Sequence, residues 1–185
     1  MGLDMYLTKR IYVGAYYEFN KVEGHIDIRT NGKQIPVDFK KVSCIEERVG
    51  YWRKANAIHK WFVDNVQDGV DDCKEYYVSR EKLNELLELC RKVKRIAKLK
   101  EGKIETGVTY KSNGEVIQNY TEGKIIENAD EIAKLLPTQE GFFFGGTGYD
   151  EYYLEDIDNT INIIEEIKRQ DDNGFRNDYY YSSSW

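Results

Sequence analysis

The sequence YWRKANAIHKWFV, residues 51–63, has the period of an amphipathic helix. At about 100° per residue its apolar side chains form one stripe, and His59 lies near the middle of that stripe rather than on the charged side. Asn56 precedes His59 by three residues and therefore lies on the same helix face. We expect this helix to pack against the rest of the chain and to bury both polar side chains, which then need hydrogen-bond partners.

Segments with strand and turn signals surround this helix. Alternating, β-branched and aromatic residues predict strands over 3–19, 40–50 and 73–79. Residues 25–39 predict a β-hairpin that turns at Asn31-Gly32, and residues 102–124 predict a second one that turns at Asn113-Gly114. The last segment, 175–185, is interpreted as an edge strand with a frayed tail over 179–185.

Three further segments have helical period. They are residues 80–100 with Ser79 as N-cap, residues 128–138 ending at Pro137, and residues 154–170. Hairpins interspersed with helices favour an α+β fold, an antiparallel or mixed sheet with about four helices to one side. We expect one domain over 1–185, with 101–126 as a candidate inserted hairpin.

Composition excludes several classes of protein. The chain has 185 residues, 41% of them hydrophobic and 32% charged, which is typical of a globular domain and not of a disordered one. A net charge of −6 argues against DNA or RNA as a partner, because phosphate backbones need a basic surface. With no run of 18 apolar residues and no secretion signal, we expect a cytoplasmic protein without membrane contact, its three cysteines reduced.

Metal and cofactor sites are not expected. Only His25 and His59 are available as imidazole ligands, and no two cysteines have the spacing of a zinc site. Residues 64–75 resemble a calcium loop, but Val66 stands where an oxygen ligand is needed. The glycines of 145–148 match neither a P-loop nor the dinucleotide fingerprint, so no cofactor is predicted.

Two segments contain candidate binding residues. On residues 51–63, Asn56 and His59 are candidates to hydrogen-bond a ligand, Arg53 to hold an anionic group and Trp52 to stack; the alternative is that the two polar residues complete the core. In the glycine-containing segment 138–153, Thr147, Tyr149 and Tyr152 are candidates beside the start of the last helix. There, Asp150 and Glu151 alternatively cap that helix.

The segments MGLDMYL (1–7), YWRKANAIHKWFV and LLPTQEGFFFGGTGYDEYY (135–153) resemble those of an uncharacterised family of small tailed-phage and prophage proteins. The resemblance covers about two thirds of the chain and assigns no catalytic residue. It implies a phage accessory protein expressed in a bacterial cytoplasm. Small phage accessory proteins often counter host defences, by sequestering a nucleotide-type immune signal or by blocking a host protein.

We therefore expect a binding protein that sequesters a small anionic, nucleotide-type ligand without chemistry. Alternatives are an inhibitor that binds a host defence enzyme through an acidic, Tyr-rich surface including 179–185, a hydrolase of a nucleotide signal that uses His59, and a structural virion component. Homo-oligomers remain compatible with all four. The expected ligand-binding residues, from the two segments together, are Trp52, Arg53, Asn56, His59, Thr147, Tyr149 and Tyr152.

Overall fold

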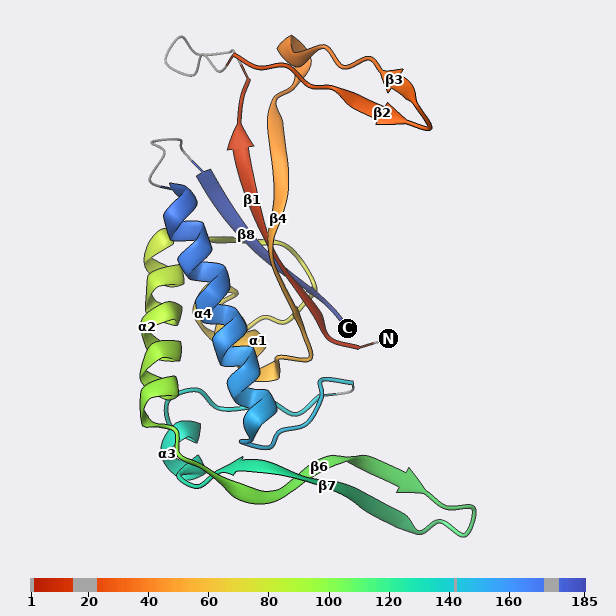
Figure 1. The fold of residues 1–185 in the computed structure, drawn as a ribbon, viewed down its shortest axis with the longest axis vertical. Coiled ribbons are helices and arrows are strands. Elements are labelled where there is room, and N and C mark those ends of the chain that lie inside the picture. Colours follow the sequence, from red (N-terminus) through yellow and green to blue (C-terminus); the bar gives the residue numbers. More distant parts are fainter. Residues whose placement is uncertain (1, 15–22, 142, 172–176) are drawn as a thin grey trace.

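The computed structural model describes residues 2–14, 23–141, 143–171 and 177–185 and has an α+β fold with antiparallel sheets (Figure 1). The helices are α1 (Asn56–Val66), α2 (Arg80–Ile96), α3 (Ala129–Ala133) and α4 (Glu151–Asp171). The strands are β1 (Asp4–Tyr12), β2 (Ile28–Thr30), β3 (Lys33–Ile35), β4 (Cys44–Arg53), β5 (Tyr76–Val78), β6 (Leu99–Tyr110), β7 (Val116–Ile126) and β8 (Asn177–Ser184). Among the described residues, no helix is both long and apolar enough to cross a membrane.

The main sheet has the strand order β4-β1-β8-β5, and its neighbouring strands are antiparallel. Buried residues alternate with more exposed ones on β1 and β8, as expected for strands with one face against a core. The helices α2 and α4 lie side by side along the sheet (Figure 1). One core joins both layers and includes Met5 and Leu7 of β1, Leu86 of α2 and Ile157 of α4.

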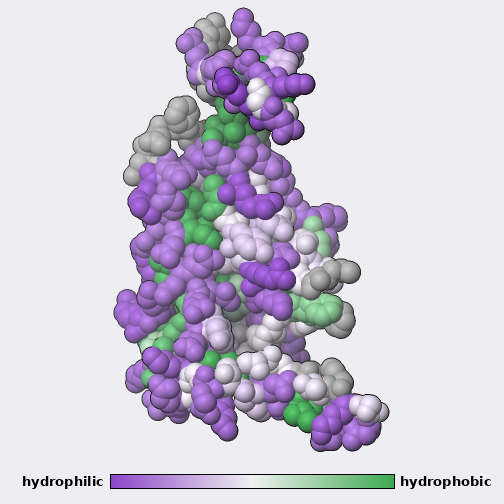
Figure 2. All heavy atoms as spheres, turned by 45° about the vertical axis from the view of Figure 1, so that its right-hand side comes forward, coloured by the Kyte–Doolittle hydropathy of each residue, from purple (hydrophilic) through white to green (hydrophobic). Residues whose placement is uncertain are grey.

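Both predicted hairpins are confirmed, and each forms a separate two-stranded sheet that projects from the body (Figure 1). In β2–β3, Asn31 and Gly32 both have positive φ, which a tight two-residue turn requires. In β6–β7, Leu99 pairs with Ile126 at the base and Tyr110 with Val116 beside the turn at Asn113-Gly114. Most of the face seen in Figure 2 is hydrophilic, including the arm that carries β2 and β3.

The helix predicted over 51–63 begins only at Asn56, so the prediction is wrong for its first residues. Residues Tyr51, Trp52 and Arg53 end strand β4 and alternate between exposed, buried and exposed. Lys54, with a φ of +61°, then turns the chain into α1. A short run of aromatic residues fits the period of a helix as well as that of a strand. Here the pairing of β4 with β1 makes the segment a strand.

The frayed tail predicted over 179–185 is also contradicted. Residues 177–184 form β8, which pairs with β1 on one side and β5 on the other and is therefore a central strand. Tyr179 and Tyr181 are buried in the core. The strand predicted over 3–19 is observed as β1 up to Tyr12, and its residues 15–19 lie outside the described part of the chain.

The remaining helices follow their predicted signals. Ser79 caps α2, because its hydroxyl oxygen accepts a hydrogen bond from the Lys82 amide at 3.2 Å. The helix ends at Ile96, four residues earlier than predicted, because residues 99 and 100 already pair in β6. The helix α4 extends from Glu151 to Asp171, and α3 precedes Pro137 as expected.

Candidate functional site

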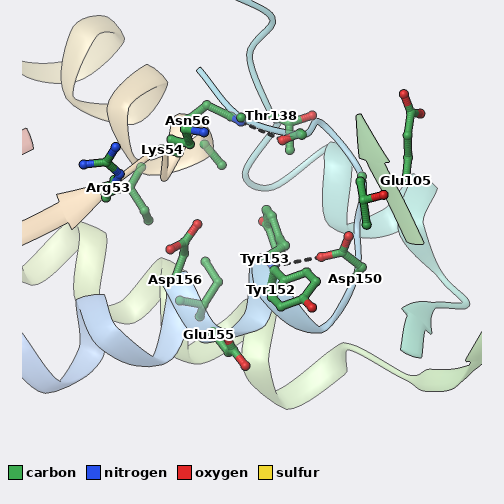
Figure 3. A pocket seen from close by; sticks show the side chains of 17 residues that line it. Arg53, Lys54, Asn56, Glu105, Thr138, Asp150, Tyr152, Tyr153, Glu155 and Asp156 are labelled. Atoms are coloured by element: carbon green, nitrogen blue, oxygen red, sulfur yellow. Dashed lines mark hydrogen bonds between the residues drawn. The ribbon is translucent and has the colours of Figure 1, made fainter. Parts of the chain in front are cut away.

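A cavity of about 450 Å³, which we call the helix cavity, lies where four segments meet: the end of β4, the start of α1, the loop 145–148 and the first turns of α4 (Figure 3). The hairpin β6–β7 contributes Glu105 and Thr106 to its wall. The helix cavity therefore joins the two segments in which the sequence predicts binding residues. Of those residues, Arg53, Asn56 and Tyr152 line it.

Asn56, the first residue of α1, fixes the loop that closes one side of the cavity. Its side-chain amide donates hydrogen bonds to the carbonyl oxygens of Gly146 (2.8 Å) and Phe144 (3.3 Å). Its side-chain oxygen accepts one from the Gln139 amide at 3.0 Å. All three hydrogen bonds hold backbone of 139–146, so Asn56 positions the cavity wall.

Two cations stand at the end of β4. The Arg53 side chain is 58% exposed and is 3.5 Å from the Asp4 carboxylate. The hydrogen bond with Tyr51 and the charge of Asp4 raise the pKa of Arg53, so the guanidinium stays charged. Lys54 is exposed, and the pairing of its amide with the Leu3 carbonyl at 2.8 Å fixes its backbone. Arg53 is thus shared with Asp4, and both cations border the cavity that an anionic group would enter.

Carboxyl groups line the side of the helix cavity opposite Arg53 and Lys54. They belong to Asp150, Glu155 and Asp156 at the start of α4 and to Glu105 on β6, and Figure 3 shows Asp156 pointing toward the side of Arg53 and Lys54. Burial, together with the charges of Glu155 and Asp150, raises the pKa of Asp156 to about 7. Near neutral pH this carboxyl is therefore divided between a form that donates and one that only accepts hydrogen bonds.

Asp150 also caps the N-terminus of α4. One of its carboxylate oxygens accepts a hydrogen bond from the Tyr153 amide at 3.0 Å, which confirms the predicted capping of α4. Burial raises the pKa of Asp150, while the amides of Tyr153 and Tyr152 act in the opposite direction. Glu151, the other predicted cap, instead accepts a hydrogen bond from the Lys124 amide of β7 at 3.4 Å.

A second cavity of about 600 Å³, which we call the loop cavity, lies beside the first. Its wall includes Glu140, Phe143 and Thr147 of the loop. It shares six lining residues with the helix cavity, namely Lys54, Glu105, Thr106, Gly145, Gly146 and Gly148.

Four of the seven predicted binding residues do not line the helix cavity. Trp52 is 1% exposed, and its indole N–H donates to the Thr160 hydroxyl at 2.9 Å, so it has no free face for stacking. Tyr149 packs against Tyr153, and its hydroxyl accepts a hydrogen bond from the Thr138 amide at 3.1 Å. Thr147 lines only the loop cavity. The burial of Trp52 follows from its place on β4, where it points into the core.

His59 is the fourth predicted binding residue that does not line the helix cavity, and it is fully buried. Its Nδ1 is 2.7 Å from the Tyr181 hydroxyl and its Nε2 is 2.9 Å from an Asp71 carboxylate oxygen. Because a carboxylate only accepts, Nε2–H donates to Asp71 and Nδ1 accepts from Tyr181. Burial raises the pKa of Tyr181 well above its usual value, which keeps that donor protonated. With both nitrogens hydrogen-bonded and the ring fully buried, His59 is a core residue.

The sequence analysis missed Lys54, Asp150 and Asp156 as lining residues. The sequence contains acid pairs at 150–151 and 155–156, but adjacent residues of a helix point apart, which is typical of a solvated acidic face. Their positions at the start of the last helix, beside a loop with three glycines, are the signal that could have placed them at a cavity. Lys54 adjoins Arg53 in the sequence and is brought to the cavity by the turn between β4 and α1.

Among the described residues, no group of three or more His, Cys, Asp or Glu side chains is placed to hold a metal ion. No family model matches the chain, and neither a curated protein nor a solved structure is significantly similar to it.

Proposed function

We propose that the protein binds a small nucleotide-type ligand in the helix cavity. The observation that carries the proposal is the division of charge across the cavity, with Arg53 and Lys54 on one side and the carboxyls of Asp150 and Asp156 on the other. A nucleotide combines an anionic group with sugar hydroxyls and base amino groups. Cations suit the first, and carboxylates accept hydrogen bonds from the others.

The ligand would also have a ring to stack. Tyr152 lines the cavity and is 53% exposed, so a face of its ring is available to a planar base. The lining carboxyls outnumber the lining cations, which disfavours a ligand whose only functional group is an anion. The expected small anionic ligand is thus narrowed to one that also donates hydrogen bonds. In a phage accessory protein, binding without chemistry would sequester a nucleotide signal of the host.

The test is a comparison of AMP, GMP, UMP and CMP with spermidine by calorimetry and melting temperature. We expect at least one mononucleotide to raise the melting temperature, and Arg53→Ala to weaken its binding at least tenfold. The matched control is Arg48→Ala. Arg48 belongs to the same strand, but its guanidinium stacks on Tyr6, away from the cavity. Binding of spermidine alone, or an unaffected Arg53→Ala, would refute the proposal.

One observation favours an enzymatic alternative. A cavity-lining carboxyl with a pKa of about 7, as in Asp156, can act as a general acid or base near neutral pH. In that case mass spectrometry would recover the bound nucleotide altered, and Asp156→Asn would stop the conversion while leaving binding in place. Recovery of the intact nucleotide after long incubation supports sequestration instead.

The protein-binding alternative loses much of its expected surface. Of the tyrosines in 179–185, Tyr179 and Tyr181 are core residues. Tyr180 contacts Arg10 and the Tyr12 hydroxyl on its own sheet. The Trp185 indole donates to Asp71 at 3.1 Å, although half of that side chain remains exposed. A continuous Tyr-rich interface is therefore not formed by this segment.

A further inference from the structure

The helix cavity and the loop cavity are separated by a thin wall. Gly145, Gly146 and Gly148 contribute to both, and so do Glu105 and Thr106 of the hairpin. Glycines have no side chain to thicken the wall between the two spaces. The two cavities therefore adjoin along the loop.

The junction of the two cavities carries a cation. Lys54 lines both, whereas Arg53 lines the helix cavity alone. A Cβ added at Gly145 would be 3.0 Å from the Lys54 Cβ, so the loop packs directly on the stem of this lysine. Lys54 is thus part of the lining that the two cavities share.

The two cavities also offer similar groups on either side of this cation. Tyr152 lines only the helix cavity and Phe143 only the loop cavity, and both are 53% exposed. Carboxyls accompany each ring, Asp150 and Asp156 in the helix cavity and Glu140 in the loop cavity. Each cavity therefore has a half-exposed aromatic side chain and hydrogen-bond acceptors in its wall, with Lys54 in the lining that they share.

We propose that the ligand has two ring-bearing ends joined by an anionic linker, with one end in each cavity and the linker at Lys54. Two nucleosides joined through a pyrophosphate have this constitution. The ring of one end stacks on Tyr152 and that of the other on Phe143, while sugar hydroxyls donate to the carboxyls. The proposal rests on the proposed function and specifies the ligand class for the same site.

The experiment compares AMP and GMP with diadenosine and diguanosine 5′,5′-diphosphate by calorimetry. We expect one of the two-ring compounds to bind at least tenfold more tightly than its mononucleotide, because the linked second end binds without a second loss of translational freedom. Phe143→Ala should lower the affinity for the two-ring compound to that for the mononucleotide and leave the affinity for the mononucleotide unchanged. Tyr152→Ala should weaken both.

Gly146→Val tests the passage between the cavities. A Cβ at Gly146 meets no atom within 4 Å, so we expect the variant to fold with an unchanged melting temperature while its side chain narrows the junction. Its binding of the two-ring compound should fall at least tenfold, and its binding of the mononucleotide less than threefold.

The outcomes separate the two proposals. A mononucleotide that binds as tightly as its two-ring counterpart would overturn the two-cavity ligand and leave the proposed function standing. An unchanged affinity of Gly146→Val for the two-ring compound would do the same. Failure of both mononucleotides and both two-ring compounds to bind would overturn both proposals.

Discussion

Two regions on either side of α1 use polar groups in opposite ways. Behind the helix, His59 hydrogen-bonds to Tyr181 through one ring nitrogen and to Asp71 through the other. At the cavity, Lys54 and the carboxyls of Asp150 and Asp156 line a space, and no ion pair joins them among the described residues. The first arrangement is complete without a ligand, and the second is not. A buried histidine is thus a poorer sign of function here than polar groups that face each other across a space.

The largest effect is expected from breaking the buried region. Tyr181 is fully buried and stacks on Phe62 with ring centroids 3.9 Å apart. Tyr181→Ala leaves a large cavity and should lower the free energy of unfolding in urea by about 3–5 kcal/mol. The matched variant Tyr181→Phe keeps the ring and removes only the hydroxyl bonded to His59, so its loss should be about 1–2 kcal/mol. Equal losses in the two variants would show that packing contributes little.

An intermediate effect is expected at Asn56, which is buried and also holds the cavity wall. Asn56→Ala removes three hydrogen bonds to the backbone of 139–146 and should destabilise by about 1–3 kcal/mol. Unlike the Tyr181 variants, it should also increase hydrogen exchange at the amides of 144–148 and weaken mononucleotide binding. A destabilised variant whose loop stays protected would show that Asn56 does not hold the cavity wall.

The next effect is a pH dependence of stability, and it is due to Asp156 in the helix cavity. The pKa of Asp156 is about 7 in the folded protein against an ordinary value of 3.8, so between these values the folded state binds a proton that the unfolded state releases. Stability contributed by this group therefore falls as the pH rises from about 4 to about 7 and is constant above. Asp156→Asn should remove this dependence and be about 2–4 kcal/mol more stable than the parent at pH 8, because a pKa raised by about 3 corresponds to about 4 kcal/mol at most. Parallel stability curves for variant and parent from pH 4 to 8 would contradict the raised pKa.

The smallest effect on stability, with a large one on binding, is expected at Lys54. Lys54→Asn removes the charge and keeps a residue that tolerates positive φ, so its unfolding free energy should stay within about 0.5 kcal/mol of the parent. Its affinity for a mononucleotide should nevertheless fall at least fivefold in calorimetry. A parent-like affinity would remove Lys54 from the site.

The sequence was sufficient for features that depend on neighbouring residues. The turn at Asn31-Gly32, the cap at Ser79 and the cap at Asp150 each follow from local chemistry, and each is observed. The segments 51–63 and 138–153, from which the expected binding residues were drawn, meet at one cavity, and Asn56 in the first has the hydrogen-bond partners that a buried polar side chain needs. Those partners include backbone carbonyls of the second.

Features decided by distant residues were not foreseeable. Trp52 fits a helical stripe as well as a strand, and only the pairing with β1 places it in the core. The segment 177–184 has strand character, but its position between β1 and β5 depends on residues more than 100 positions away. Local pattern fixes the type of an element, and long-range pairing fixes which of its side chains are accessible to a ligand.

The position of β8 also affects how the protein folds during synthesis. Because β8 lies between β1 and β5, these two strands, formed first during synthesis, have no direct pairing with each other. A nascent chain that has been translated as far as α4 still lacks the strand that joins them. The ribosome must therefore release residues 177–184 before the main sheet can close, and a chain that stops short of them exposes unpaired strand edges to chaperones and proteases.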